Sequence, residues 1–234
     1  MKGIFRKEYG HYFKTMTGYA FIAMYLALSG AVFTLTNLLA RNGDIKSYFS
    51  LFTTASVLLF PILTMGVFAE ERKQKTDELL FTSPVTLRAI VLGKYMAMLA
   101  VLLIPMAVTF IYPVILRFFG AGAFIETAGN YIGLLLLSMA CIAIGQFIST
   151  LTESQFVSAM VTYSIFALLL FAASGTTFTN QPVLSALLSF LAIVKHSEGF
   201  SYGVFDLMEV IYFVSITVLF VSLSVFVLEN RRLA

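Results

Sequence analysis

Six apolar segments, each about as long as a lipid bilayer is thick, constrain this chain more than any other feature. A helix needs roughly 20 apolar residues to cross the hydrocarbon core, and it satisfies its own backbone hydrogen bonds there. Only 12% of the residues are charged, against about 25% in soluble domains. The sequence therefore predicts an all-α membrane protein with one transmembrane domain over residues 1–234. The predicted spans are Tyr19–Ala40, Tyr48–Ala69, Ala89–Leu116, Tyr131–Leu151, Phe156–Ala173 and Leu207–Leu228.

Residues 1–16 have the pattern of an amphipathic helix that lies in the membrane interface. Apolar side chains recur on one face at helical spacing, and cations lie on the opposite face, near anionic headgroups. The alternative is a plain basic flank that only marks the cytoplasmic side. The apolar face consists of Phe5, Tyr9, Tyr12, Phe13 and Met16, and the polar face of Lys7, His11 and Lys14.

A seventh apolar segment, Val183–Val194, has only 12 residues. It is too short to cross a bilayer as a helix. We expect a short non-spanning helix, interfacial or re-entrant, between the fifth and sixth spans.

The distribution of Lys and Arg predicts the orientation, since cytoplasmic loops carry an excess of both. With the amino terminus inside, six spans return the carboxy terminus to the same side. The inner side then holds Lys2, Arg6, Lys7, Lys14, Arg72, Lys73, Lys75, Arg88, Lys94, Arg231 and Arg232, and the outer side Arg41, Lys46, Arg117 and Lys195. We therefore expect a multi-pass protein of the cell membrane with both termini cytoplasmic.

The stretch between the second and third spans is the most heavily charged part of the chain. Ser83-Pro84 predicts the start of the third helix, because Ser caps free amides and Pro fits the first turn. Lys94 lies close enough to that end for its side chain to snorkel back to the interface. Before the cap, Glu71–Phe81 has helix-favouring residues without Gly or Pro. This helix either folds back onto the membrane and its own spans, or offers its apolar end to a soluble partner.

Several kinds of catalytic or ligand site are not expected. A phosphate-binding loop needs G-x-x-x-x-G-K-[ST], and around Gly93-Lys94 the first glycine is replaced by Arg88 and the final Ser or Thr by Tyr95. H-E-x-x-H is missing from the sequence, and so is any His or Cys pair at metal-ligand spacing. A net charge of +3 is too small to indicate nucleic-acid binding. We expect no enzyme active site and no metal site.

An ion-coupled secondary transporter is a second alternative. Such carriers usually place ionisable groups at membrane depth, and the centres of the six predicted spans have none. Small residues on the fourth span, Cys141, Gly145 and Ser149, instead predict a close helix contact. Gln146 beside them is expected to bond across helices, and Pro61, Pro105 and Pro113 to bend their spans.

Three stretches of sequence resemble one family of membrane proteins. "EERKQKTDELLFTSPV" followed by "IVLGK" is similar to the first cytosolic loop of ABC type-2 transporter permeases, especially the gliding-motility-type branch. "IAIGQFISTLTESQFVSAMVTY", residues 142–163, resembles the family's fourth span, inner turn and fifth span. "LSFLAIVKHSEGFSYGVFDLMEVIYF" with the "ENRRL" tail resembles its outer loop, last span and basic end. The resemblance covers nearly the whole chain. It departs at Lys75-Thr76, where the family commonly has Gly-Thr.

The resemblance implies a permease subunit, with Glu71–Phe81 forming or adjoining a coupling helix in a groove of a separate ATPase subunit. Apolar anchoring would come from Leu79, Leu80 and Phe81, and orientation of the contact from Glu71, Arg72, Asp77 and Glu78. A smaller contact would come from the second inner turn, which comprises Thr152, Glu153, Ser154 and Gln155.

The same resemblance implies that this chain binds no cofactor of its own, with ATP and Mg²⁺ in two copies of the partner ATPase. A second permease copy or a paralogue would complete the pathway, and export is favoured over import. The transported substrate is not identified by the sequence. An alternative is a mechanical transmitter that moves no solute and acts on an extracytoplasmic accessory subunit through residues 174–206.

Overall fold

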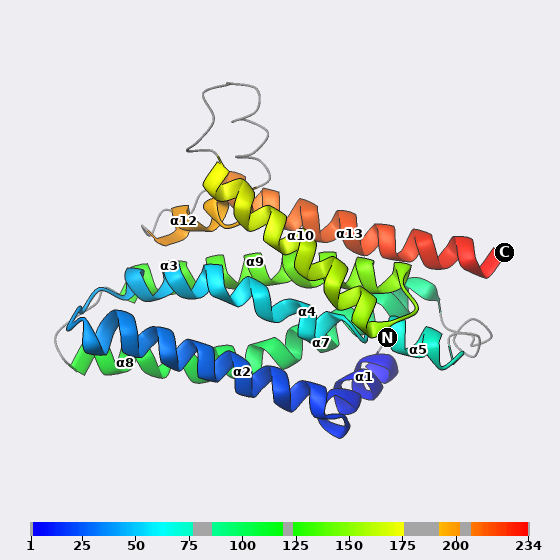
Figure 1. Ribbon diagram of the computed structural model, residues 1–234, viewed down its shortest axis with the longest axis horizontal. Helices are drawn as coiled ribbons and strands as arrows, with labels where there is room; N and C mark the ends of the chain where they lie inside the picture. The colour runs from blue at the N-terminus through cyan, green and yellow to red at the C-terminus, as the bar shows by residue number, and fades with distance from the viewer. Residues whose placement is uncertain (1, 77–85, 119–123, 176–191, 202–206, 234) are drawn as a thin grey trace.

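The computed structural model describes residues 2–76, 86–118, 124–175, 192–201 and 207–233, and the regular elements in these residues are all helical (Figure 1). Six helical stretches are long and apolar enough to cross a membrane. The predicted six-span, all-α membrane fold is therefore confirmed. The stretches are Met16–Leu39, Ile45–Lys73, Leu87–Phe118, Thr127–Leu151, Gln155–Ala172 and Leu207–Arg232.

Several of the spans consist of more than one helical element. The first span joins α2 (Met16–Phe33) to the π-helical η1 (Thr34–Leu39), and it follows α1 (Lys2–Lys14). The second joins α3 (Ile45–Ser56), the 3₁₀ turn η2 (Val57–Leu59), α4 (Phe60–Thr64) and α5 (Ala69–Lys73). The remaining elements are α7 (Leu87–Thr109), α8 (Ile111–Phe118), α9 (Phe124–Leu151), α10 (Gln155–Gly175), α12 (Lys195–Ser201) and α13 (Leu207–Leu233).

Two of the three intramembrane prolines coincide with breaks in these helices. Pro61 lies in the first turn of α4, directly after η2. Pro113 lies four residues after Thr109, where α7 ends, so its missing N–H removes the bond that would continue the ladder. Pro105 remains inside α7.

The helix predicted for Glu71–Phe81 differs from the structure. The chain is helical only to Lys73 and turns at Gln74-Lys75, with Lys75 at φ 54°. Residues Asp77–Phe81 lie outside the described residues. The expectation of an uninterrupted helix from Glu71 is therefore wrong at Gln74. The helix ends there because the N–H groups of Lys75 and Thr76 bond back to the carbonyls of Arg72 and Glu71.

Two other predicted boundaries also differ. α7 begins at Leu87, after Thr86 in an extended conformation, and not near Ser83; Ser83 and Pro84 themselves lie outside the described residues. Most of Val183–Val194 lies outside them too. Its described end, residues 192–194, is not helical, and α12 starts at Lys195.

α9 is the centre of the bundle. In the most apolar stretch of the fourth span, which α9 forms, 72% of the residues are buried. The corresponding share in the last span is 17%. α9 packs against α13, α12, α4 and α10. Both chain termini, α5 and the turn between α9 and α10 lie at one end of the molecule, and α8 and the connection from α2 to α3 lie at the other (Figure 1). The basic helix α1, the charged helix α5 and the basic last turn of α13 thus lie at a single end.

Candidate functional site

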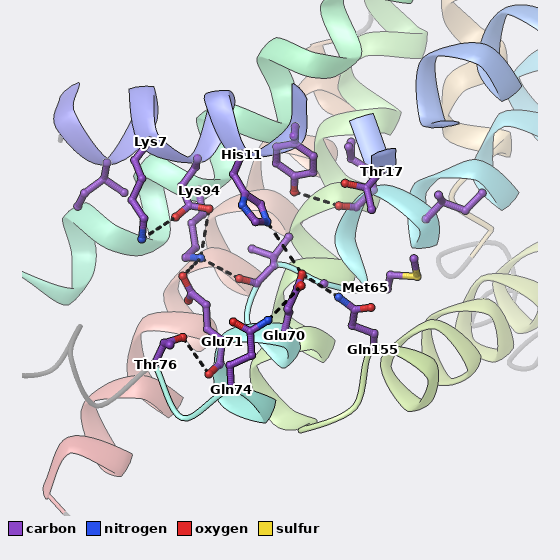
Figure 2. A pocket seen from close by; sticks show the side chains of 17 residues that line it. Lys7, His11, Thr17, Met65, Glu70, Glu71, Gln74, Thr76, Lys94 and Gln155 are labelled. Atoms are coloured by element: carbon purple, nitrogen blue, oxygen red, sulfur yellow. Dashed lines mark hydrogen bonds and ion pairs between the residues drawn. The ribbon is translucent and has the colours of Figure 1, made fainter. Parts of the chain in front are cut away.

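Lys94 on α7 is the most deeply buried charged side chain in the described residues, with 2% exposure. Its Nζ lies 2.8 Å from Glu71 Oε1 and 3.3 Å from Glu8 Oε2, and it donates to the carbonyl of Val67 at 2.8 Å (Figure 2). The Phe68 ring centroid is 4.9 Å away. The predicted snorkelling of Lys94 is wrong, because carboxylates from two other elements reach its ammonium group inside the protein.

The surroundings of Lys94 supply what a buried cation needs. Taking an ammonium group out of water is costly unless it is paired and hydrogen-bonded. Two carboxylates and one carbonyl match its three N–H donors, and the Phe68 ring adds a cation–π contact. Glu8 comes from α1 and Glu71 from α5, so one side chain of α7 ties three elements together. We call Glu8, Glu71 and Lys94 the buried ion cluster.

Glu70, the neighbour of Glu71, joins α5 to another part of the protein. Gln155, the first residue of α10, donates from Nε2 to Glu70 Oε2 at 2.9 Å. His11 Nε2 on α1 lies 4.0 Å from the same oxygen. Gly66 makes room for this contact, since a Cβ there would lie 2.9 Å from Gln155 Nε2.

Arg72 extends the contact to the turn between α9 and α10. Its guanidinium forms an ion pair with Glu153 and donates to the Leu151 carbonyl at 3.5 Å. Three consecutive side chains of α5 therefore contact different parts of the protein: Glu70 contacts α10, Glu71 contacts α7, and Arg72 contacts the α9–α10 turn.

Of the residues predicted to contact the ATPase, the structure brings together Glu71, Arg72, Glu153 and Gln155. Thr152 donates to the Ile148 carbonyl, and the Ser154 carbonyl accepts from Ser158 N–H, so both lie at helix ends in the same turn. The remaining predicted residues, Asp77, Glu78, Leu79, Leu80 and Phe81, lie outside the described residues.

The row of small residues on α9 lies against α4 and α5. Gly145 faces Thr64 so closely that a Cβ would lie 2.3 Å from Thr64 Oγ1. Ser149 Oγ accepts the backbone N–H groups of Phe68 and Ala69 at 3.0 and 3.2 Å. The chain is not helical between α4 and α5, so this hydroxyl supplies partners that the helix ladder lacks there. Cys141 of the same row is fully buried.

Gln146 is also buried on α9 and donates to the Val91 carbonyl of α7 at 3.0 Å. This bond links two spans, as predicted for a polar side chain inside a helix bundle.

The end of α5 forms a Schellman motif. Thr76 N–H bonds to the Glu71 carbonyl at 2.9 Å and Lys75 N–H to the Arg72 carbonyl at 3.1 Å. In this motif the residue at the position of Lys75 takes the left-handed conformation, which glycine adopts without strain. Lys75 therefore stands at a position that suits glycine.

Replacing Lys75 with Gly is expected to stabilise the protein by about 1 kcal/mol, since the left-handed conformation costs L-residues roughly that much. The measurement is the apparent unfolding temperature of the detergent-solubilised protein, which should rise by about 2 °C. Lys73→Gly is the matched control: Lys73 is helical, so the same change should lower that temperature. A lower temperature for Lys75→Gly would contradict the motif.

A cavity of about 600 Å³ lies between α1 and the ends of α4 and α5 (Figure 2). Its polar lining includes Lys7, Glu70 and the buried ion cluster. Tyr12 also lines it and donates to the Leu63 carbonyl at 3.1 Å. Burial, and secondarily nearby carboxylates, raise the pKa of the Tyr12 phenol, so this donor keeps its proton. Among the described residues no group of three or more His, Cys, Asp or Glu side chains is placed to hold a metal ion.

Glu8 is the residue of the buried ion cluster that sequence reasoning missed. It is the only acidic residue in α1, and it is spaced four residues from Ile4 and from Tyr12, so the three share one helix face. That face packs inward, whereas Met16, assigned to the apolar face, is 87% exposed at the start of α2. The signal in the sequence was that Glu8 is an isolated acidic residue in an otherwise basic helix.

Comparison with known protein families assigns this chain to one of them. The sequence profile of the ABC-2 family transporter protein matches residues 36–196, more than half of the 234-residue chain. This segment contains the second to fifth spans and both charged turns. Comparison with curated proteins gives no match. The gliding-motility-type branch stays a prediction. The chain belongs to the ABC-2 transporter family, and it is a membrane-spanning subunit of an ABC transporter.

Proposed function

We propose that this chain is the permease of an ABC exporter and couples ATP hydrolysis in a separate subunit to translocation of a substrate across the cytoplasmic membrane. The observation that carries the proposal is the position of α5. Three of its charged residues, Glu70, Glu71 and Arg72, contact α1, α7, the α9–α10 turn and the start of α10. Family membership disfavours the alternative of an ion-driven carrier.

α5 is well placed to distribute a force. Residues 77–85 follow three residues after its end, and they include the predicted apolar anchors Leu79, Leu80 and Phe81. A displacement of this segment would reach α5 within a few residues. From there it would pass to α7 through Lys94 and to the α9–α10 turn through Glu153. Short charged contacts fix relative position better than apolar contacts, because their geometry is directional.

The complete transporter would contain two permease chains, identical or paralogous, and two ATPase subunits that hold ATP and Mg²⁺. Six spans would form half of the pathway. An extracytoplasmic accessory subunit, acted on mechanically, is the alternative output of the same machinery.

We further propose that the end holding both termini and α5 faces the cytoplasm. Single cysteines introduced at Asn42 and Phe118 in a Cys141→Ser background should react with an impermeant thiol reagent added outside cells. Cysteines at Lys75 and Glu153 should react only after the membrane is opened. External labelling at Lys75 would invert the orientation and remove the basis for the coupling role.

The coupling role is tested at the predicted anchors. The double change Leu79→Ala and Leu80→Ala should weaken ATPase association at least tenfold, because truncating one well-buried anchor costs about 2 kcal/mol or more. Membrane insertion should be unaffected. The measurement is copurification of the ATPase with the tagged permease, together with the chain stoichiometry, which should be two to two.

The matched control is Lys46→Ala, at the predicted outer end, which should leave copurification unchanged. If the double leucine variant retains its ATPase as well as the parent does, the loop is not the coupling contact.

A further inference from the structure

We infer that α1 is a rigid part of the coupling machinery: α1, α5 and α7 move as one body, with Lys94 as the positioning residue that joins them. This inference rests on the proposed function, since it describes how α5 passes on a displacement. It also departs from the prediction that α1 simply lies on the membrane surface, where a helix would be held by lipid and could move by itself.

Three separate contacts hold α1 against the spans. Near its start, Ile4 fits against Gly93 of α7, and a Cβ on Gly93 would lie only 2.9 Å from Ile4 Cγ2. One turn later Glu8 reaches Lys94. One turn further Tyr12 bonds to the Leu63 carbonyl of α4. These contacts follow one face of α1 over most of its length.

The burial of the middle contact makes separation of α1 costly. The side chains of Lys94 and Glu8 are 2% and 10% exposed. Moving α1 away would separate the Glu8 carboxylate from Lys94 and would leave Lys94 with Glu71 as its one carboxylate partner. Separating a buried charge from its partner is strongly unfavourable. The ion pair of Arg72 with Glu153, by comparison, has exposures of 29% and 68% and would lose little on opening.

Lys94 is the joint because it contacts α1 and α5 at the same time. Its Nζ bonds Glu71 of α5 at 2.8 Å and the Val67 carbonyl just before α5. A displacement of α5 therefore acts on Lys94 directly, and Lys94 holds Glu8. Removing Glu8 should release α1 while the bond between Lys94 and Glu71 persists.

The first test measures a distance between spin labels at Arg6→Cys on α1 and Val108→Cys on α7, both exposed positions, in a Cys141→Ser background. The copurified complex is compared without nucleotide and after trapping with ATP and vanadate. The parent should give one narrow distance distribution that is the same in both states. Glu8→Gln should broaden it or add a second distance.

Lys7→Gln is the matched control. It changes a neighbouring charge on the same helix whose side chain is 66% exposed, and it should keep the narrow distribution. A parent distance that shifts on trapping would show that α1 separates from α7, and the inference would be wrong. It would equally be wrong if Glu8→Gln gave the parent distribution in both states.

A covalent link provides the second test. Ile4 Cβ lies 3.2 Å from a Cβ built on Gly93, a few tenths of an ångström shorter than the separation of about 3.5–4.5 Å in disulfides. The Ile4→Cys, Gly93→Cys pair should cross-link on oxidation without changing the ATP hydrolysis rate of the complex in liposomes. Loss of hydrolysis that a reductant reverses would mean that α1 must release, and would overturn the inference.

The two proposals fail in different ways. If no ATPase copurifies with the parent, the proposed function fails, yet the distance between α1 and α7 in the permease alone still shows whether Glu8 holds α1. If the parent couples normally and Glu8→Gln has no effect, only the rigid-body inference fails.

Discussion

Lys94→Met is expected to destabilise the protein by about 3–5 kcal/mol, the cost of removing one partner from a buried ion pair. Methionine retains a similar apolar stem but not the ammonium group. Glu8 and Glu71 would then remain as neighbouring carboxylates without the cation that neutralises them. The measurement is the fraction of detergent-solubilised protein that stays folded on heating, compared with the parent.

Two further variants separate the charge effect from packing. Combining Lys94→Met with Glu8→Gln and Glu71→Gln should recover most of the loss, since no buried charge remains and coupled residues are not additive. Lys7→Met removes a largely exposed lysine and should cost about 0.5 kcal/mol or less. If Lys94→Met were as stable as the parent, the buried ion cluster would not exist as described.

Gly145→Ala is expected to destabilise the protein by about 3 kcal/mol, at the upper end of the usual cost of overpacking a core. The added methyl group would lie 2.3 Å from Thr64 Oγ1 and 2.8 Å from Thr64 Cβ. Both residues are buried in regular helices, so the strain cannot be relieved by a rotamer change alone. Thermal unfolding in detergent and the yield of monodisperse protein would both report the loss.

The matched control for Gly145→Ala is Gly30→Ala in the first span. There the nearest atom to an added Cβ is Tyr112 Oη at 3.7 Å, an ordinary van der Waals contact, and Ala favours a helix over Gly. Adding Thr64→Gly to Gly145→Ala should restore much of the stability by moving the small residue to the facing helix. Purely additive losses in the double variant would show that the two residues do not touch.

The number, order and approximate bounds of the spans could be predicted from sequence because hydrophobicity over a bilayer length is a local property. Each apolar segment must become a helix to satisfy its backbone, whatever its neighbours do. The family could be predicted too, since the charged loop and the two later motifs are continuous stretches of sequence. Gly145 and Ser149 were found for the same reason: their spacing places them on one helix face.

Helix ends were predicted less accurately, because they depend on competing local caps. Ser83-Pro84 carries a strong capping signal, yet α7 starts after Thr86. No Gly or Pro interrupts Glu71–Phe81, yet α5 ends in a Schellman motif with Lys75 in the left-handed conformation. Propensities differ by less than about 1 kcal/mol for most residues, which is too little to overrule tertiary contacts such as those of Glu71 and Arg72.

By itself the sequence determined that this is a six-span membrane protein of the ABC-2 type, since both properties reside in contiguous residues. Only the tertiary structure decided that Lys94 is buried, that Glu8 faces it and that α1 is attached to α7. The partners of Lys94 come from α1 and α5, elements far apart in the chain. Whether a charge snorkels to water or is buried depends on which opposite charges lie within about 4 Å in space, and no local pattern of residues encodes that distance.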